Sequence, residues 1–434
     1  MSVHAPDTDS ADVLVIGGGP AGSTAAALLA RRGHRVTLLE KDRHPRFHIG
    51  ESLLPANLRL LDQLGVADEV RSIGMQKWGA EFVSPRHAHH QDYRFAEAWD
   101  KNMPYAYQVR RSQFDHILIR NAARAGAQVL EQCRVRTVEL SVEGGGVRVH
   151  AEQADGAQCC WRARFLLDAS GRDTYLANQL GCKRRNPRHG SAALFAHFSG
   201  ARRHGGERAG YISLYWFEHG WFWFIPLHDG ATSVGAVVWP YYLKSRTVPV
   251  EQFFLATIAA CAPLAERLAS AQRLTEVMAT GNYSYSSTRS HGDNYLMLGD
   301  AFAFVDPVLS SGVLLAMNSA FAGAETVDIC LRHPARAPAA LRHFDRVMRH
   351  GPRQFSWFIY RITQPILISL FMRPSNPLRV KEALLSVLSG DIFGTTPIWH
   401  SLRAFKLLYA LRALLHPVRS GADLRRHRRN IRPA

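Results

Sequence analysis

The chain has 434 residues, of which 47% are hydrophobic and 21% charged, and its 33 glycines and 21 prolines are spread along the sequence. This composition excludes disordered, collagen-like and small disulfide-stapled proteins and predicts a soluble globular protein. The net charge of +17, part of it concentrated in residues 419–434, favours an anionic partner or substrate.

The cysteine pattern and the apolar segments indicate the compartment. Six cysteines form no CxxC pair and no zinc-like spacing with histidine, so we expect reduced thiols. Residues 1–11 lack the apolar part of a secretory signal, and the most apolar window, residues 355–372, is interrupted by Arg361 and Pro365. We therefore expect a cytoplasmic protein without a transmembrane segment, in which residues 355–372 form a buried or interfacial helical hairpin.

The first forty residues predict a βαβ unit. Residues 12–16 form a short apolar run, which is followed by glycines and by a good helix-forming segment at residues 23–32. A second apolar run at residues 35–39 ends at Glu40. This order indicates a parallel sheet with a right-handed crossover.

Later segments of the chain complete the same α/β domain. The pattern predicts a helix at residues 114–125 and strands at residues 128–130, 147–151, 165–167 and 295–298. Because these pieces are scattered, we expect a discontinuous Rossmann-like domain made of residues 12–76, 101–180 and 281–330.

The intervening sequence has a different character. Residues 192–240 alternate apolar and polar residues and are rich in Tyr, Trp and Phe, as in antiparallel strands of a half-exposed sheet. We expect an inserted antiparallel β-sheet substrate domain, built from residues 77–100 and 181–280. The predicted remainder is a flexible N-terminus, a C-terminal helical region and a basic flexible tail, at residues 1–11, 331–418 and 419–434.

A glycine motif predicts a dinucleotide. Gly17, Gly19 and Gly22 form GxGxxG between the first strand and its helix. Such glycines allow a tight turn, close approach of a pyrophosphate, and close packing of helix on strand. Glu40 stands eighteen residues after Gly22, where an acceptor for a ribose hydroxyl belongs, and an acid there argues against a 2′-phosphate.

Two further segments distinguish FAD from NAD. Arg111 lies three residues before Phe114, and Asp300 follows Gly299 a few residues before Asp306. Taken alone, the second segment is explained by a turn with a helix N-cap. Together with the glycine motif, these residues resemble the FAD-binding domain of the flavoprotein monooxygenase superfamily, which implies FAD and makes Asp300 an acceptor for ribityl or ribose hydroxyls.

Three motifs narrow the resemblance: GESLLP at residues 50–55, Lys77 before Trp78, and WFWFIP at residues 221–226. With residues 306–312 they resemble the flavin-dependent halogenases over nearly the whole chain. The resemblance implies that reduced FAD, delivered by a separate flavin reductase, reacts with O2 to a flavin hydroperoxide. Chloride or bromide then yields hypohalous acid, which halogenates an electron-rich aromatic ring in secondary metabolism.

The WFWFIP strand has an expected orientation. Trp221 and Trp223 share one face of a strand, whereas Phe222 and Phe224 share the other. From the strand alone, an aromatic core strand is the commoner explanation. The resemblance implies that the two indoles separate flavin from substrate, so that oxygen is not transferred directly to the ring.

Three residues are expected to carry the chemistry. Lys77 is one of few lysines in an arginine-rich chain; a lone lysine usually lies at the surface, but burial lowers the pKa of an amine. The resemblance implies that Lys77 holds hypohalous acid or forms a haloamine. Ser311 and Gly312 precede a helical stretch at residues 313–331 whose free amides attract an anion. The resemblance places the halide there, and an ordinary serine N-cap is compatible with that role.

The resemblance also implies a set of flavin-binding residues: Gly17, Gly19, Pro20, Ala21, Gly22, Glu40, Lys41, Arg46, Gly50, Glu51, Ser52, Arg111, Asp300, Pro307, Gly312 and Val313. No metal ligand is expected, because the cluster of His87, His89 and His90 lies among Pro, Arg and Gln and is interpreted as a polar hairpin loop.

One position bears on the substrate. The tryptophan-specific branch of the family carries a glutamate where Leu309 stands, and residues 306–313 instead resemble the branch that acts on pyrroles and phenols, often tethered to an acyl carrier protein. The expected partners are a flavin reductase, an aromatic small molecule and such a carrier, and not nucleic acid. The alternative is a single-component FAD-dependent aromatic hydroxylase, which oxidises NAD(P)H itself and needs no halide.

Overall fold

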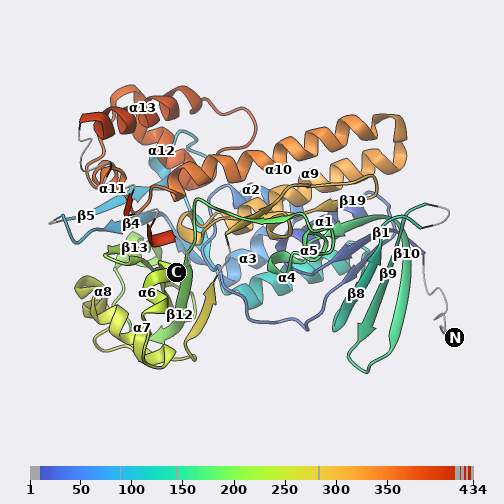
Figure 1. Cartoon of the computed structure of the whole chain (residues 1–434), viewed down its shortest axis with the longest axis horizontal. Coiled ribbons are helices and arrows are strands. Elements are labelled where there is room, and N and C mark those ends of the chain that lie inside the picture. Colours follow the sequence, from blue (N-terminus) through green and yellow to red (C-terminus); the bar gives the residue numbers. More distant parts are fainter. Residues whose placement is uncertain are drawn as a thin grey trace.

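The computed structural model describes residues 10–87, 89–142, 145–281 and 284–415, together with residues 421, 425–426 and 429–431. Figure 1 shows two β-sheets at opposite sides of the molecule, with two long helices, α9 (Gly312–Arg332) and α10 (Ala337–Ile359), running side by side along one flank. Three further helices of the C-terminal region lie above the second sheet.

The first sheet contains the predicted βαβ unit. Its strands follow the order β7 (Gln128–Leu130), β2 (Val36–Leu39), β1 (Ser10–Ile16), β10 (Gln158–Asp168), β9 (Val147–Gln153) and β8 (Cys133–Glu139). The first half of β10 pairs antiparallel with β9, and its second half pairs parallel with β19 (Tyr295–Met297). The strand therefore begins seven residues before its predicted start, because the predicted apolar run covers only its parallel half.

Helix α1 (Pro20–Arg31) packs between the sheet, α4 (Arg111–Arg124) and α9. Both α1 and α4 begin three residues before their predicted starts, and in α1 a proline occupies the first turn, where its missing N–H is not needed. Gly17 has φ +100°, and a Cβ at Gly22 would lie 1.9 Å from the Gly17 carbonyl oxygen. The first and third glycines thus serve the turn and the helix packing, as predicted.

The second sheet is formed by strands from both predicted insertions. Its order is β16 (Gln272–Arg273), β12 (Ala192–Ser199), β15 (Thr232–Val238), β14 (Gly220–Pro226), β13 (Ile212–Phe217), β4 (Gly79–Val83) and β5 (His90–Arg94), with β17 (Met278–Gly281) also paired to β12. β13 pairs parallel with β4, whose strand lies far earlier in the chain. The division of the chain into domains stays a prediction.

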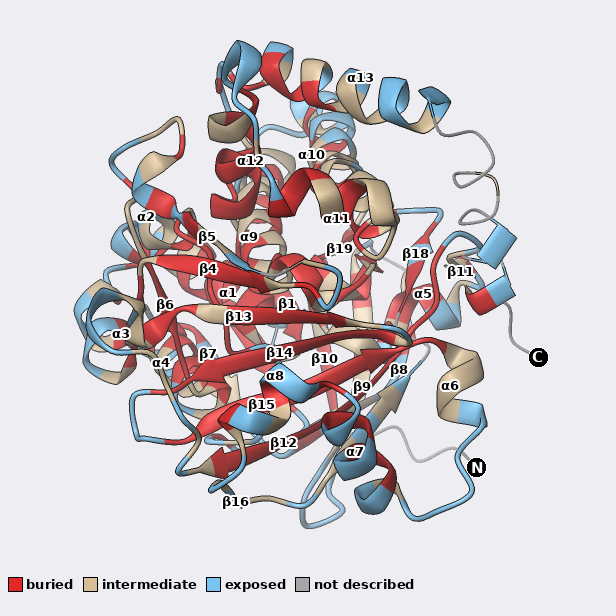
Figure 2. Ribbon diagram, turned by 90° about the vertical axis from the view of Figure 1, so that its left-hand side faces the viewer, coloured by how far each residue is buried: buried red, intermediate tan, exposed pale blue. Residues whose placement is uncertain are grey.

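The prediction of a half-exposed second sheet is wrong. Strands β14 and β15 are buried along their whole lengths, as the red strands of Figure 2 show. One face packs against the C-terminal helices, and the other against α7 (Val250–Ala259) and α8 (Ala262–Arg267). The two faces also separate the aromatic residues as predicted: Trp221 and Trp223 belong to the first core, whereas Phe222 and Phe224 belong to the second.

The C-terminal region is helical, as predicted. It comprises α10, α11 (Pro365–Met372), α12 (Val380–Ser389) and α13 (Trp399–Leu415). The turn between α10 and α11 makes residues 355–372 a largely buried helical hairpin. In the described part of the chain, α9 alone is long and apolar enough to cross a bilayer by length and composition, and here it packs against α1 and α10 inside the protein.

The structure describes a few residues of the two chain ends, whose predicted flexibility stays a prediction. Ser10 and Ala11 belong to β1. Residues 421, 425–426 and 429–431 are helical, and Arg426 pairs with Glu218 at 3.1 Å. The other residues of the predicted N-terminal segment and tail lie outside the described residues.

Smaller elements connect these parts. β3 (Met75–Lys77) pairs with β6 (Ala106–Gln108), and a third sheet joins β11 (Lys183–Arg185), β18 (Tyr285–Ser287) and β20 (Ala303–Phe304). The remaining helices are α2 (Asn57–Leu64), α3 (Ala67–Ile73), α5 (Tyr175–Gln179) and α6 (Pro240–Lys244).

Candidate active site

A cavity of about 520 Å³ lies between the carboxyl ends of the parallel strands and the second sheet. Ligands of open α/β sheets bind at such strand ends. All the predicted flavin-binding residues except Gly22 line it: Gly17, Gly19, Pro20, Ala21, Glu40, Lys41, Arg46, Gly50, Glu51, Ser52, Arg111, Asp300, Pro307, Gly312 and Val313. Gly22 lies behind the wall, where it closes the packing of α1 on β1.

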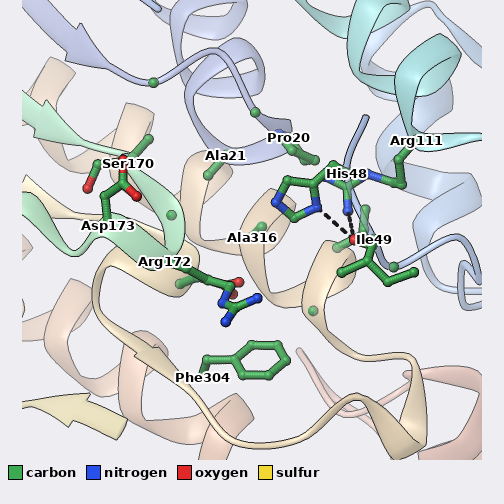
Figure 3. A pocket seen from close by; sticks show the side chains of 18 of the residues that line it. Pro20, Ala21, His48, Ile49, Arg111, Ser170, Arg172, Asp173, Phe304 and Ala316 are labelled. Carbon is green, nitrogen blue, oxygen red and sulfur yellow. Dashed lines mark hydrogen bonds between the residues drawn. The ribbon is translucent and has the colours of Figure 1, made fainter. Parts of the chain in front are cut away.

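The glycine turn leaves room for a phosphate. A Cβ built on Gly19 would find its nearest described neighbour at Arg46 Nη2, 3.8 Å away. The free amides at the start of α1 adjoin this space, and such amides attract an anion. Figure 3 shows Pro20, Ala21 and Arg111 on one side of the cavity and Arg172 and Phe304 on another. The cavity thus combines free helix amides at the glycine turn with a mostly apolar lining, which fits FAD.

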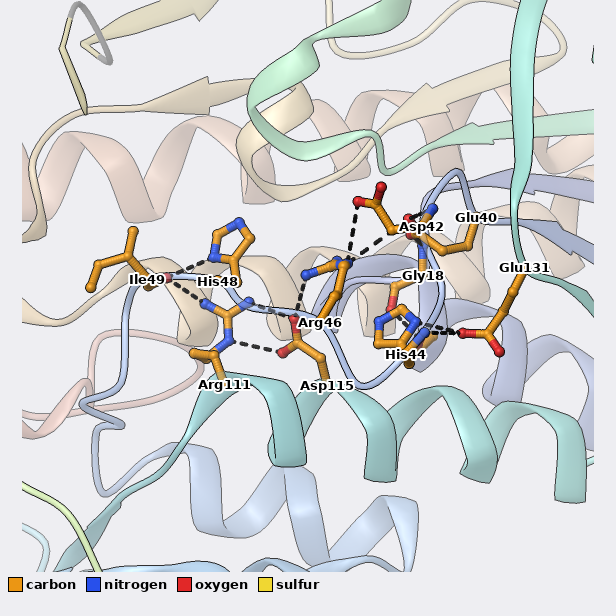
Figure 4. Close-up of polar contacts among 11 residues, drawn as sticks. Gly18, Glu40, Asp42, His44, Arg46, His48, Ile49, Arg111, Asp115 and Glu131 are labelled. Carbon is orange, nitrogen blue, oxygen red and sulfur yellow. Dashed lines mark hydrogen bonds and ion pairs between the residues drawn. The ribbon is translucent and has the colours of Figure 1, made fainter. Parts of the chain in front are cut away.

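Glu40 reaches back to the glycine turn. Its Oε2 accepts from the Gly18 amide at 2.5 Å and its Oε1 accepts from the Asp42 amide at 2.8 Å (Figure 4). Each carboxylate oxygen has two lone pairs, so Glu40 keeps the capacity to accept from ribose hydroxyls.

An arginine pair surrounds a buried acid beneath the cavity. Arg111 donates to both carboxylate oxygens of Asp115, at 2.8 and 3.0 Å, and Arg46 lies 3.3 Å from the same carboxylate (Figure 4). Burial raises the pKa of Asp115, but Arg111, His48 and Arg46 together outweigh it and hold the pKa below its usual range. Burial and Arg111 together lower the pKa of His48 to about 4, so this ring is neutral. The loop that carries Arg46 and His48 is therefore fixed to α4.

Asp300 lies in the cavity wall, at the position predicted for a hydroxyl acceptor. Burial raises its pKa to about 6, although Arg111 and Arg172 act in the opposite direction. At neutral pH the carboxylate form still predominates and can accept hydrogen bonds.

Lys77 does not line the cavity but lies directly behind its wall. The side chain is 1% exposed, and Nζ donates to Ser52 Oγ at 2.9 Å and to the Leu53 carbonyl oxygen at 2.5 Å. Nζ also lies 5.2 Å from the centroid of the Phe95 ring. Burial lowers the pKa of Lys77 to about 7. Because Ser52 does line the cavity, the buried amine is hydrogen-bonded to a residue of the cavity wall.

The turn before α9 meets the cavity at the opposite wall. Pro307, Ser310 and Gly312 line the cavity, whereas Ser311 is buried behind them. Ser311 stands at the N-cap position, but its side chain makes no capping bond within the described chain. The first-turn amides of α9 are therefore not satisfied by this serine.

The tryptophan wall is one part of the boundary of the cavity. Trp221, Trp223 and Ile225 line it from β14. Trp223 Nε1 donates to Ser233 Oγ at 3.1 Å, and its ring occupies the space where a Cβ on Gly235 would lie, 2.1 Å from the nearest ring atom. The wall is thus held by the neighbouring strand.

Several lining residues are absent from the predicted set: Phe47, His48, Cys133, Arg172, Phe195, Thr280 and Phe304. Arg172 follows the carboxyl end of β10, so the position of strand ends in a parallel sheet could have indicated it. Phe195 and Cys133 enter through strand pairing between distant segments, which no local pattern in the sequence reveals.

A group of possible metal ligands has another explanation. Donor atoms of Glu81, His90 and Asp92 lie within 4.8 Å of one another. However, Glu81 is already paired with His204 at 2.9 Å and Arg208 at 3.0 Å. Burial raises the pKa of Glu81, but His204, Ser213 and Arg267 outweigh it and hold the pKa at about 2. Among the residues that the structure describes, this group therefore belongs to an ion-pair network.

In the predicted polar loop the rings of His87 and His89 lie 6.0 Å apart, edge to face, and each also has a hydrogen-bond partner of its own. His87 contacts Ser84 Oγ at 3.0 Å, and His89 contacts the Met372 carbonyl oxygen at 2.7 Å. The two rings face different partners.

Comparison with known proteins identifies relatives over most of the chain. A family model of an FAD binding domain matches residues 10–336. The chain is 35% identical over 350 residues to a tryptophan 2-halogenase of Chondromyces crocatus, which corresponds to 78% of this chain and 65% of that protein. It is 29% identical to a 1H-pyrrole-2-carbonyl-[peptidyl-carrier protein] chlorinase of Pseudomonas fluorescens, over 88% of this chain and 89% of the relative.

A solved structure shows the same arrangement. The myxobacterial chondrochloren halogenase CndH, described as a variant of FAD-dependent halogenases, superposes with a TM-score of 0.79 at 34% identity, covering 91% of this chain and 93% of that one.

Proposed function

The chain belongs to the flavin-dependent halogenases, and from this premise we propose that it uses reduced FAD, O2 and a halide to halogenate an electron-rich aromatic compound. The observation that carries the proposal is the position of Lys77, a buried amine with a pKa of about 7 behind the cavity wall. A hydroxylase that transfers oxygen directly has no need of such a buried amine behind its flavin cavity.

The cavity residues divide the cofactor-binding work. The glycine turn and the α1 amides would hold the pyrophosphate, Glu40 and Asp300 would accept from hydroxyls, and Gly50–Ser52 would adjoin the ring system. Bound in its reduced form, FAD would supply two electrons that reduce O2 to the peroxide level, and the peroxide oxygen would take two more from halide to give hypohalous acid and water. The amides near Ser311 and Gly312 would hold the halide, because helix N-termini attract anions.

The remaining residues direct the halogen. Trp221 and Trp223 keep the aromatic substrate out of the cavity. Hypohalous acid leaves the cavity and binds at the amine nitrogen, Nζ, of Lys77. The halogen then forms a bond to a ring carbon, the ring loses a proton, and the oxygen leaves as water. In this scheme halide oxidation and ring substitution occur at different places.

We propose that the substrate is a pyrrole or a phenol, either as a free molecule or attached to an acyl carrier protein. Leu309 is buried and apolar where the tryptophan branch has an acid, and one relative is named for a carrier-bound pyrrole substrate. We further propose a separate flavin reductase as partner and a cytoplasmic location.

Product analysis tests the proposal. The purified protein, FAD, a flavin reductase and NADH are supplied with chloride or bromide and with free or carrier-bound aromatic acids. The expected result is a product whose mass carries the supplied halogen and which disappears when halide is omitted. A hydroxylated product formed without halide, or rapid reduction of bound FAD by NADH without the reductase, would establish the hydroxylase alternative instead.

A further inference from the structure

A buried carboxylate anchors the turn that leads to α9. Asp306 Oδ1 accepts from the Val308 amide at 3.0 Å and so caps the short helix η5 (Pro307–Leu309). Its Oδ2 accepts from His189 Nε2 and from the Ser191 hydroxyl, each at 2.8 Å. Because a carboxylate only accepts, His189 Nε2 carries the hydrogen.

The surroundings of this anchor are apolar and aromatic. The His189 side chain is 2% exposed, and its ring centroid lies 5.9 Å from that of Trp239 and 6.1 Å from that of Tyr360. His189 Nδ1 has no hydrogen-bond partner among the residues that the structure describes. Hydrogen bonds to a carboxylate are strengthened in such a water-poor environment, so the anchor is a rigid one.

The turn that it holds is strained. Ser310 has φ +54°, a left-handed conformation that a residue with a side chain adopts at a cost in free energy. Such a conformation persists only where the surroundings impose it. Asp306 fixes one end of η5, and α9 fixes the residues that follow Ser310. Since Pro307, Ser310 and Gly312 line the cavity, the anchor sets how far their backbone projects into it.

We propose that His189, Ser191 and Asp306 are positioning residues that fix the halide-binding amides of the turn before α9. The inference rests on the proposed function, because it gives a task to the halide site proposed there. None of the three residues lines the cavity, so they act through the backbone of the turn.

Four variants test the proposal. Ser191→Ala and His189→Leu each remove one donor to Asp306, whereas His189→Gln offers a replacement amide N–H. His34→Leu is the control: His34 lies 2.6 Å from Asp328 near the other end of α9 and forms a His–Asp pair that is less deeply buried. For each protein we would measure the bromide concentration that gives half-maximal halogenation, the rate at saturating bromide, and the melting temperature. Bromide titration of the oxidised holoprotein, followed by the absorption of bound FAD, gives a second measure of affinity.

We expect His189→Leu to raise the half-saturating bromide concentration about tenfold, and Ser191→Ala to raise it at least threefold. Each change corresponds to the loss of one charge-assisted hydrogen bond. The rate at saturating bromide should fall by less than about threefold, and His189→Gln should recover most of the affinity. His34→Leu should lower the melting temperature without moving either bromide value.

The outcomes separate the two proposals. If the wild-type protein gives no halide-dependent product, the proposed function fails at the first measurement. If it does, and both Ser191→Ala and His189→Leu keep bromide affinity within twofold of wild type, the positioning role is wrong. An equal shift in His34→Leu would also overturn it, since general destabilisation would then explain the effect. Should His189→Leu not fold, Ser191→Ala and His189→Gln decide alone.

Discussion

Lys77 Nζ and Ser52 Oγ form a 2.9 Å hydrogen bond across the wall of the flavin-sized cavity. The hydroxyl belongs to a cavity residue, whereas the amine is enclosed by protein on the far side. The Leu53 carbonyl oxygen is the second acceptor, at 2.5 Å. These two acceptors match the two hydrogens of a neutral amine and leave its lone pair available, which fits a nucleophile toward electrophilic halogen.

Replacing the Lys77 amine distinguishes the oxidation of halide from the halogenation of the aromatic ring. Lys77→Met keeps the length of the side chain but removes the amine, and we expect halogenation to fall by at least about 100-fold, as for loss of a group acting in proton or atom transfer. FAD binding and consumption of reduced flavin should stay within about twofold of wild type. The control is Lys101→Met at an exposed position. Halogenation by Lys77→Met near the wild-type rate would contradict the assignment.

The lowered pKa of Lys77 predicts how activity changes with pH. Burial brings the pKa from 10.5 to about 7, so the neutral fraction rises from about 0.1 at pH 6 to about 0.9 at pH 8. If the neutral amine reacts, halogenated product per reduced flavin should rise several-fold over this interval. A fall over the same interval would show that the ammonium form acts instead. The measurement is product yield at saturating halide and substrate.

The same shift has a consequence for stability. Between pH 7 and pH 10.5 the unfolded chain binds a proton at Lys77 that the folded chain does not. The contribution of Lys77 to the free energy of unfolding therefore rises with pH in this interval. The difference between wild type and Lys77→Met in urea unfolding, measured at pH 7 and pH 9, should move in favour of the wild type at the higher pH. An unchanged difference would mean that the folded pKa is not lowered.

A substitution in the strand next to β14 should displace a side chain of the tryptophan wall. A Cβ on Gly235 would lie 2.1 Å from the Trp223 ring, so Gly235→Ala should lower the free energy of unfolding by about 2 kcal/mol through overpacking. The displaced indole should also weaken FAD binding, measured by fluorescence titration. Gly205→Ala serves as control, because φ is −95° and no atom lies within 4 Å of a Cβ there. Equal behaviour of the two variants would show that the wall adapts freely.

A second buried pair joins the cavity loop to the second sheet. His197 Nε2 lies 2.9 and 3.1 Å from the two carboxylate oxygens of Glu51, and both side chains are nearly fully buried. His197→Leu leaves a buried carboxylate without this donor and should lower the free energy of unfolding by about 3 kcal/mol. In the double variant Glu51→Leu/His197→Leu the loss should be smaller than the sum of the single losses. Additive losses in urea unfolding would show that the two groups are not coupled.

Much of the fold could be predicted because local patterns carry it. The apolar run, glycine turn and helix from β1 to α1 form one continuous segment, and the alternation of Trp221 and Phe222 fixes their faces without knowledge of the partner strands. The predicted start of β10 lies too late in the chain, because the first half of the strand mixes apolar and polar residues and depends on β9 for pairing. The sequence also suggested an exposed face for the second sheet, since the covering helices come from distant parts of the chain.

The site was less predictable where its residues act through neighbours. The motifs indicate Lys77 and Ser52 individually, but only the folded chain brings the amine and the hydroxyl together. The side-chain cap of α9 expected at Ser311 is not formed, whereas Asp306 caps the short helix η5 just before it. Arg172 lines the cavity just after the end of β10, and which strands lie beside that end depends on the order of strands in the sheet.

The position of β19 beside β10 has a consequence for biosynthesis. Its three residues pair with a strand more than 120 residues earlier, and α9, which completes the cavity, follows still later. Contacts of such sequence separation form slowly, because a long loop must be closed before they stabilise anything. During translation the first sheet emerges without its last parallel strand, and the flavin cavity stays open until Ala316, its last lining residue, has left the ribosome. Capture of the cofactor is therefore a late event in the maturation of this enzyme.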